Sequence, residues 1–495
     1  MLELMAVALA LSLPAESFFV GDPGVKLIAA RNAAAHPASP LEISLPVIGA
    51  ETNVHVDPFF VVHGDHAHAL TSEVFPLLSA PFIAAAGIRG AYLLPVCGFL
   101  LSIFSCVYLA AALDLRRNSS RVLLGAVLGT PLLFYGLEFW EHAPAVGLAA
   151  LATTIIVKSG NTEDTRSRGR RGRALVAGLL YGIAILLRPE AAWFFLAVAA
   201  SSRLLPSPPG WPTFALAVAG IALALAPLVV YSIVHFGTLA PPHVETQAAL
   251  LTQGWLDARA HIVAAWFVPF SGQATPMWGL ALVGMTAVGS LVPGSRMGGW
   301  VFLVVLTTVD VVLVALTAPN DGGGQWGPRY LLFAFVPASV LIAGALQAIP
   351  RQSVARTVIV IAVLVAGVWV QRAGYRELRG TKNLYGRVLD LVRQQVPAGG
   401  YAVTDLWWLD QVAAAATSDR TMLFVPGTDD RRNVMHRLHA AGVSTVTAFV
   451  SRDESPDIDA WNHGPCYEPA GQTAIEVRNL VAITLRRLPD CDAGR

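Results

Sequence analysis

The sequence predicts an all-α polytopic membrane bundle followed by a small C-terminal α/β domain. Hydrophobic residues make up 55% of the 495-residue chain, charged residues make up 14%, and the mean hydropathy is +0.57. An ordinary soluble protein does not have this composition. Charge-free runs such as 91–113, 211–234 and 330–350 are long enough to cross about 30 Å of hydrocarbon as helices. We therefore expect about eleven membrane spans in residues 1–371, with the soluble domain over 372–495.

The first expected span is formed by residues 1–14. No Lys or Arg precedes its apolar run, so the charged first region of a signal peptide is missing, and we expect the span to be retained. The net charge of +1 gives no sign of a nucleic-acid partner, and the short Arg clusters between spans are explained by orientation. Cys466 and Cys491 lie in the polar tail and could pair if that tail is extracytoplasmic.

The segment after the first span, residues 15–89, is too long for a mere connection. Asp22 followed by Pro23 is a helix-start signal, and the helix it predicts runs along the membrane surface to about Ala35. Two interpretations of Asp22 stay open, a helix cap or a functional carboxylate. An extended piece around 43–47 and a His-rich stretch follow.

The apolar run 174–205 is interrupted by Arg188, Pro189 and Glu190, so it forms either one kinked helix or two short ones. Two spans keep every short Arg-bearing loop inside, and the positive-inside rule favours them. With two spans, the interruption lies on the same outer side as Asp22 and the carboxylates at 138 and 141. The remaining spans are expected at 122–137, 143–157, 211–234, 277–292, 300–316, 330–350 and 357–370. In the C-terminal domain we expect strands at 401–404, 422–425 and 444–450 and a helix at 431–441.

Three carboxylates of this outer side could carry acid–base chemistry. Asp22, Glu138 and Glu141 could supply a general base and contacts to an acceptor hydroxyl, because an ionised carboxylate accepts hydrogen bonds and takes a proton as an oxygen nucleophile attacks. Glu138 and Glu141 are three residues apart and would share a face at a helix end. The alternative is that they are interfacial charges closing a hairpin.

Three cations could hold a phosphate leaving group at the membrane surface. Lys26, Arg188 and Arg329 each lie at an expected outer helix, where two or three positive charges would neutralise a departing phosphate. Snorkelling of the same side chains to lipid headgroups is the alternative.

A third group combines His and Asp side chains in the first outer loop. Close spacing of these residue types could bind a divalent cation, but the loop has no second well-spaced ligand pair to close a site. We interpret the group mostly as solvated loop, and the sequence requires no cofactor. Its members are His55, Asp57, His63, Asp65, His66 and His68.

Four short motifs together resemble the GT-C superfamily of membrane glycosyltransferases that use polyprenyl-phosphate sugars. The likeness is nearest to the protein mannosyltransferase and aminoarabinose transferase type, and it covers nearly the whole membrane part. The order of the motifs, their common side and the final soluble domain carry it. The motifs are residues 21–27 (GDPGVKL), 139–142 (FWEH), 187–190 (LRPE) and 326–330 (WGPRY).

The resemblance implies an inverting sugar transfer with Asp22 as the base on the acceptor hydroxyl. Arg188 would contact the donor phosphate, and Arg329 and Lys26 would assist. Many relatives carry a second acidic residue directly beside the first, whereas Pro23 follows Asp22 here. A second carboxylate must then come from elsewhere. The expected contacts to sugar or acceptor are Asp57, Glu138, Glu141, His142, Glu190 and Tyr330.

We therefore predict an inner-membrane transferase that moves a hexose or pentose from a polyprenyl-phosphate donor to a lipid, glycan or protein acceptor outside the cytoplasm. A polytopic transporter or lipid flippase is the alternative from another class, and a scaffold for the C-terminal domain is a third. A transporter would show paired repeats with broken helices and charges at the midplane. Here the charges gather at one face, and only Asp310 is central.

Overall fold

The protein is described by a computed structural model that divides into two compact units. The helical unit comprises Met1–Ala10 and Tyr92–Glu377, and the mixed unit comprises Leu11–Ala91 and Leu378–Arg495. The described residues are 2–48, 51–52, 56, 58–114, 130–161, 167–241, 244, 255–267, 297–320, 322, 326–348, 354–455, 461 and 466–489.

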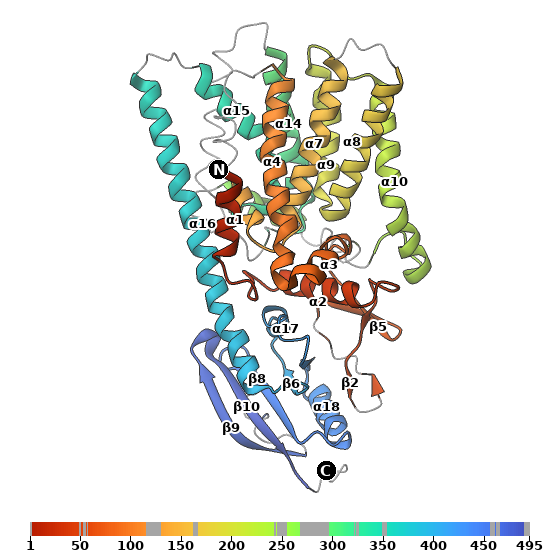
Figure 1. Ribbon diagram of the computed structural model, residues 1–495, viewed down its shortest axis with the longest axis vertical. Coiled ribbons are helices and arrows are strands. Elements are labelled where there is room, and N and C mark those ends of the chain that lie inside the picture. The colour runs from red at the N-terminus through yellow and green to blue at the C-terminus, as the bar shows by residue number, and fades with distance from the viewer. Residues whose placement is uncertain are drawn as a thin grey trace. The chain divides into compact units, whose positions relative to one another are not determined.

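The helical unit is a bundle in which α4 packs on α7, α7 on α8, α8 on α10, and α14 on α9 and α15 (Figure 1). Small residues bring the helix axes close together. A Cβ on Gly178 of α8 would lie 2.0 Å from the carbonyl oxygen of Ala217 in α10. The elements are α1 (Leu2–Leu11), α4 (Leu93–Ala112), α6 (Leu132–Gly136), α7 (His142–Asn161), α8 (Ser167–Leu187), α9 (Glu190–Ser201), η3 (Ser202–Leu204), α10 (Trp211–Phe236), α12 (Trp255–Phe267), α14 (Met297–Thr317), η5 (Arg329–Leu331), α15 (Phe335–Ala348) and the first part of α16 (Val354–Gln395).

Within the described residues, four stretches are long and apolar enough to cross a membrane. They are Val74–Ala112, His142–Gly160, Trp211–Phe236 and Gly298–Thr317. Expected spans at 91–113, 143–157, 211–234 and 300–316 fall on these stretches. The span expected at 277–292 and most of the one at 122–137 lie outside the described residues, so the count of about eleven stays a prediction.

The interruption at Arg188 and Pro189 separates two helices, as the sequence favoured. α8 ends at Leu187 and α9 begins at Glu190. Pro189 lacks an N–H, and its ring disfavours the helical conformation of the residue before it, so the helix stops there. α9 has 12 residues and is about 18 Å long, which is shorter than the hydrocarbon layer.

Two expected helix boundaries are wrong. α15 begins at Phe335 rather than at Tyr330, because Pro337 is tolerated only in a first turn and sets the helix start close to itself. The last expected span, 357–370, is part of α16, which has 42 residues and runs on to Gln395. Its second part keeps a helical apolar period, with Val388, Leu389 and Val392 buried, so the change to polar composition does not end the helix.

The mixed unit contains a five-stranded sheet with strand order β7-β6-β8-β10-β9. β6 is parallel to β7 and β8, whereas β10 is antiparallel to β8 and β9. A second sheet has the order β1-β5-β4. The elements are α2 (Asp22–Ala35), β1 (Ile43–Ser44), β2 (Val47–Ile48), β3 (Glu51–Thr52), β4 (Phe60–His63), β5 (His66–Ala69), α3 (Val74–Ala86), η1 (Gly87–Tyr92), β6 (Tyr401–Thr404), α17 (Leu409–Val412), β7 (Thr421–Phe424), α18 (Thr428–Ala440), β8 (Thr445–Ser451), β9 (Tyr467–Ile475), η7 (Val477–Asn479) and β10 (Leu480–Arg487).

The five-stranded sheet has a hydrophobic core on each face. Successive strand residues point to opposite faces, so Ala402 joins the core covered by α16, while Val403 joins the core covered by α18. Ile48 of the first outer loop is buried in the α18 core, and Ile88 packs on the α16 core. The first outer loop is therefore packed onto the C-terminal domain within the mixed unit.

Most elements expected in the mixed unit are confirmed. α2 has the predicted bounds, β6 matches exactly, β7 and β8 lie within one residue of the expected strands, and the helix expected at 431–441 is α18, which begins three residues earlier. β9 and β10 were missed. Nearly all of β9 is exposed, so it lacks the buried apolar run by which the other strands were recognised.

Candidate functional site

In the helical unit, Arg188 lies in the gap between α8 and α9 and binds two carboxylates. Its Nε and Nη2 atoms donate to the two oxygens of Glu190 at 3.1 and 2.6 Å, and its Nη1 donates to Oε1 of Glu141 at 3.3 Å. All three side chains are largely buried. The fork to Glu190 is the bidentate geometry that gives Arg–carboxylate pairs their directional strength. The structure thus brings three predicted site residues together.

Tyr330 lies beside both predicted phosphate-binding arginines. The guanidinium carbon of Arg329 lies 5.0 Å from the centre of the Tyr330 ring, and that of Arg188 lies 5.6 Å from it. Arg329 Nη2 also donates to the Tyr330 hydroxyl at 3.2 Å, and that hydroxyl donates to Oδ1 of Asn320 at 3.1 Å. One aromatic ring therefore holds two cations by cation–π contact.

The connection between α6 and α7 carries Glu138 and Glu141, and His142 is the first residue of α7; all three are fully or almost fully buried. Oε1 of Glu138 accepts from the backbone N–H of Phe139 at 3.0 Å, and the Glu138 carbonyl oxygen accepts from the N–H of Trp140 at 2.8 Å, which closes a tight local turn. The expectation that Glu138 and Glu141 share a helix face is wrong, because α6 ends at Gly136 and α7 begins at His142. Both carboxylates are buried, and the alternative that they are interfacial charges closing a hairpin stays open.

The His142 ring is enclosed by aromatic side chains. Its centre lies 4.9 Å from that of Tyr135 and 5.5 Å from that of Trp140. His142 Nδ1 lies 4.0 Å from Oε1 of Glu141, the oxygen that also accepts from Arg188. His142 therefore belongs to the same buried group as the arginine fork.

Asp22 lies in the mixed unit, at the start of α2. Gly21 is the residue in the N-cap position, and Asp22 is the first helical residue. Oδ2 of Asp22 accepts from Nζ of Lys26 at 3.0 Å, one turn further along; the Lys26 side chain is 1% exposed and that of Asp22 is 26% exposed. A predicted base and a predicted phosphate ligand are therefore paired. The meeting of Asp22 with Arg188 stays a prediction, because the two residues belong to different units.

Sequence reasoning missed Lys382 of α16, which is fully buried. Its ammonium group lies 5.7 Å from the centre of the Phe18 ring. Phe18 precedes Asp22 by four residues in the sequence. A signal was present in the sequence. Leu378, Tyr385 and Leu389 continue the buried face of an amphipathic helix, and a Lys at position 382 interrupts that apolar period.

The His- and Asp-rich stretch forms the β4–β5 hairpin, in which His63 is opposite His66. Nδ1 of His66 lies 2.8 Å from the exposed carboxylate of Asp65. His55 and Asp57 lie outside the described residues. In the described part of the chain, no group of three or more His, Cys, Asp or Glu side chains could hold a metal ion.

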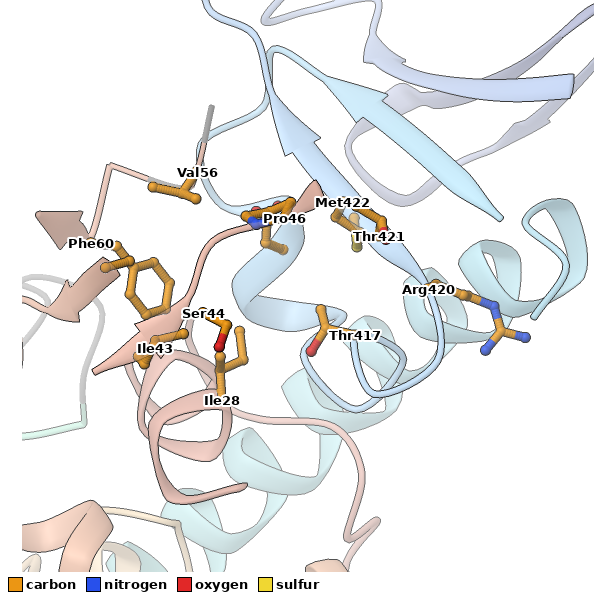
Figure 2. A pocket seen from close by; sticks show the side chains of 12 residues that line it. Ile28, Ile43, Ser44, Pro46, Val56, Phe60, Thr417, Arg420, Thr421 and Met422 are labelled. Carbon is orange, nitrogen blue, oxygen red and sulfur yellow. The ribbon is translucent and has the colours of Figure 1, made fainter. Parts of the chain in front are cut away.

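The mixed unit also contains a cavity of about 230 Å³ beside α2 (Figure 2). Ile28, Ile43 and Phe60 approach it from one side and Thr417 and Met422 from the other. The guanidinium of Arg420 points away from the cavity, and its Nε donates to the carbonyl oxygen of Val396 at 2.7 Å. The lining is therefore mostly apolar, and none of the predicted site residues that the structure describes contributes to it.

Comparison with known proteins identifies the fold. No protein-family model matches the sequence, and no curated protein matches it. Among solved structures, ArnT from Cupriavidus metallidurans bound to undecaprenyl phosphate superposes with a TM-score of 0.61 at 13% identity, over 97% of this chain and 96% of that chain. This protein has the ArnT fold.

The apo state of the same ArnT gives a TM-score of 0.60 at 13% identity, over 97% of both chains. The oligosaccharyltransferase from Archaeoglobus fulgidus gives 0.48 at 12% identity, over 90% of this chain and 69% of that chain. The two ArnT structures thus show that this chain shares the fold of ArnT over almost the whole length of both chains.

Proposed function

We propose that this protein is an integral-membrane glycosyltransferase that moves a sugar from a polyprenyl-phosphate donor to an acceptor hydroxyl on the extracytoplasmic side. The ArnT fold supports this proposal, because that structure was solved with undecaprenyl phosphate. The observation that carries it in this chain is the pair of arginines on the Tyr330 ring. Two neighbouring guanidinium groups are suited to an anion such as a lipid phosphate.

The buried carboxylates leave part of the Arg188 guanidinium available to a phosphate. Arginine has five N–H donors, and bonds to Glu190 and Glu141 use three of those on Arg188. The other two can donate to oxygens of the phosphate. Glu190 and Glu141 hold the guanidinium in one orientation, so the phosphate meets a cation that is already placed. Arg329 and Lys26 are proposed to add positive charge near the same phosphate.

In the proposed reaction, the acceptor oxygen forms a bond to the anomeric carbon on the face opposite the phosphate. The bond between that carbon and the phosphate oxygen breaks, its electron pair leaves with the phosphate, and the configuration inverts. The acceptor proton goes to Asp22. An Asp with an ordinary pKa of about 3.9 is a weak base, but it suffices when the proton leaves late, after positive charge has developed on the sugar. Neutralising the phosphate then matters more than base strength.

The other predicted polar side chains are proposed to bind the sugar or the acceptor. Carboxylates accept hydrogen bonds from sugar hydroxyls, and a Tyr or His side chain can donate or accept them. Burial excludes water that would compete for these bonds. The residues assigned to this role are Asp57, Glu138, Glu141, His142, Glu190 and Tyr330.

Replacing the base tests the proposal. Purified protein in lipid vesicles is given a polyprenyl-phosphate sugar labelled in the sugar, and transfer or release of the label is measured. We expect Asp22→Asn to lower turnover by about 100-fold or more with donor binding retained. Asp429→Asn is the matched control, because the Asp429 side chain is 99% exposed.

If Asp22→Asn turned over the donor as fast as the wild-type protein, Asp22 would not be the base. Movement of intact labelled lipid across the vesicle by the wild-type protein, without any release of sugar, would instead identify a lipid flippase. The side of the reaction is measured with labelled donor placed in one leaflet of the vesicle only. The leaflet from which the donor is consumed is the side on which the reaction occurs.

A further inference from the structure

The start of α2 is pressed against the C-terminal domain within the mixed unit. A Cβ on Gly24 would lie 1.8 Å from the backbone carbonyl oxygen of Gln411 in α17, and a Cβ on Gly21 would lie 1.6 Å from Oε1 of the same residue. Neither glycine has a positive φ. Glycine is therefore needed here for close approach rather than for an unusual backbone conformation.

A second contact holds the far part of α2. Nη1 of Arg31 donates to the carbonyl oxygens of Ala414 at 3.0 Å and Ala415 at 3.4 Å, just beyond the end of α17. A hydrogen bond from a charged guanidinium to a carbonyl oxygen is stronger than one from a neutral donor. Gln411 is itself fixed, because its Nε2 donates to the carbonyl oxygen of Trp407 at 3.1 Å.

Between the glycine contact and the Arg31 contact, α2 is not tightly packed against the C-terminal domain. The cavity of Figure 2 borders Ile28, in the middle of α2, opposite Thr417 and Met422 of the C-terminal domain. The contact is therefore closed at the end that carries Asp22 and incompletely filled further along. α3 packs against another side of α2, so the helix is held between α3 and α17.

We propose that the C-terminal domain positions Asp22, with Gln411 as the residue that fixes the start of α2. The inference rests on the proposed role of Asp22 as the base. In this arrangement, the domain is part of the catalytic apparatus rather than a separate module for partner binding. A shift of α2 by about 1 Å would move the carboxylate relative to a bound acceptor and lower kcat by about 100-fold. Arg188 and Arg329 lie outside α2 and keep their contacts to the donor phosphate, so the donor KM, which depends on α2 only through Lys26, should change less than kcat.

Two glycine substitutions test the contact with different severity. Gly24→Ala places a methyl group against backbone, which cannot move without shifting α17, so we expect kcat to fall by about 100-fold. Gly21→Ala places it against the end of a flexible side chain, so the fall should be smaller. Gln411→Ala removes that side-chain end. Added to Gly21→Ala, it should therefore partly restore kcat. Added to Gly24→Ala, it should not, because the added methyl group there meets the backbone of Gln411.

Gly380→Ala is the control, since Gly380 lies within α16 and its added Cβ would meet nothing within 4 Å. Turnover is expressed per folded protein, from monodisperse samples with a cooperative thermal transition. Arg31→Met and Arg31→Lys extend the test to the second contact, and we expect Lys to retain more activity than Met. If Gly24→Ala does not fold, the comparison of Gly21→Ala with the double variant Gly21→Ala, Gln411→Ala tests the contact.

The outcomes separate this inference from the proposed function. Wild-type kcat in folded Gly24→Ala and Gly21→Ala, together with loss of turnover in Asp22→Asn, would overturn the positioning role and keep the base. Retained turnover in Asp22→Asn would overturn both. A rise in donor KM with unchanged kcat in the glycine variants would also contradict positioning of the base.

Discussion

Arg188 and Glu190 are joined by a two-bond fork, at 2.6 and 3.1 Å, across the single residue Pro189. The break between α8 and α9 makes this fork possible, because within a regular helix two residues this close in sequence would point to different sides. The proline therefore does more than end a helix. It turns two neighbouring charges toward one another and leaves Glu141 to complete the group.

We expect Arg188→Lys to lose most of the activity although it keeps the charge. An ammonium group cannot reproduce the fork to Glu190 and the bond to Glu141 together. Turnover of a labelled donor should fall by about 100-fold, with a raised donor KM. Arg432→Lys is the control because the Arg432 side chain is 59% exposed. Equal turnover in Arg188→Lys and wild type would show that charge alone is needed here.

Arg188→Met should unfold more easily than Arg188→Lys. It leaves Glu141 and Glu190 buried without their cation, and breaking a buried ion pair costs about 3–5 kcal/mol. The measurement is the thermal midpoint in the same detergent for both variants. A midpoint equal to wild type for Arg188→Met would mean that water or lipid reaches these carboxylates.

The Tyr330 ring should matter more than its hydroxyl. Tyr330→Phe keeps the ring beside Arg188 and Arg329 and loses only the bonds to Arg329 and Asn320. Tyr330→Leu also loses two cation–π contacts, each worth about 0.5–2 kcal/mol. We expect donor affinity to fall by about a few-fold for Tyr330→Phe and by about 10-fold or more for Tyr330→Leu, because only the second variant loses the energy of the two cation–π contacts. The reverse order would place the hydroxyl on the substrate.

Asp310→Asn should retain activity and raise thermal stability. Both carboxylate oxygens of Asp310 are buried in α14 without a hydrogen bond to any described residue. An ionised carboxylate in such a place is costly, and an amide of the same shape removes the charge. The checks are the thermal midpoint and turnover. Loss of turnover in a folded Asp310→Asn protein would instead place Asp310 in the site.

The stability of the C-terminal domain should depend on pH through Asp405. Burial raises the pKa of this carboxyl, despite the bond from Ser455 Oγ at 2.8 Å and the charge of Arg431. In the unfolded chain the pKa is about 3.9. Between these two values, the unfolded state binds fewer protons than the folded state, so the free energy of unfolding falls as pH rises through this window.

Asp405→Asn removes the titration and should flatten that part of the pH profile. The profile is followed by thermal unfolding of the intact protein between pH 4 and pH 7, compared with wild type. An unchanged slope in Asp405→Asn would assign the pH dependence to another group.

Local signals in the sequence were sufficient for α2 and for the break between α8 and α9. Asp22-Pro23 at one end and His36-Pro37 at the other fix the bounds of α2, because both pairs act on the backbone of their own neighbours. Pro189 fixes the break between α8 and α9 in the same way. The start of α15 was missed, since the influence of Pro337 reaches backwards into an apolar run that shows no other boundary.

The partners within the site could be predicted only in part. The same outer side was expected for Arg188 and Glu141, and they meet across 47 positions of chain. That Glu141 lies in a turn rather than on a helix face depends on how α6 stops after Gly136, which no residue pattern announced. The position of Lys382 within the apolar period of α16 could have been recognised, but its contact with Phe18 could not, because Phe18 is far away in the sequence.

The glycine contact at Gln411 has a consequence for protein engineering. A chimera that exchanges residues 378–495 alone would set a foreign surface against Gly21 and Gly24, with no space for any misfit. The transplantable module is discontinuous in sequence, and it includes residues 11–91 as well. Grafts intended to change acceptor choice must therefore carry both segments from the same donor protein.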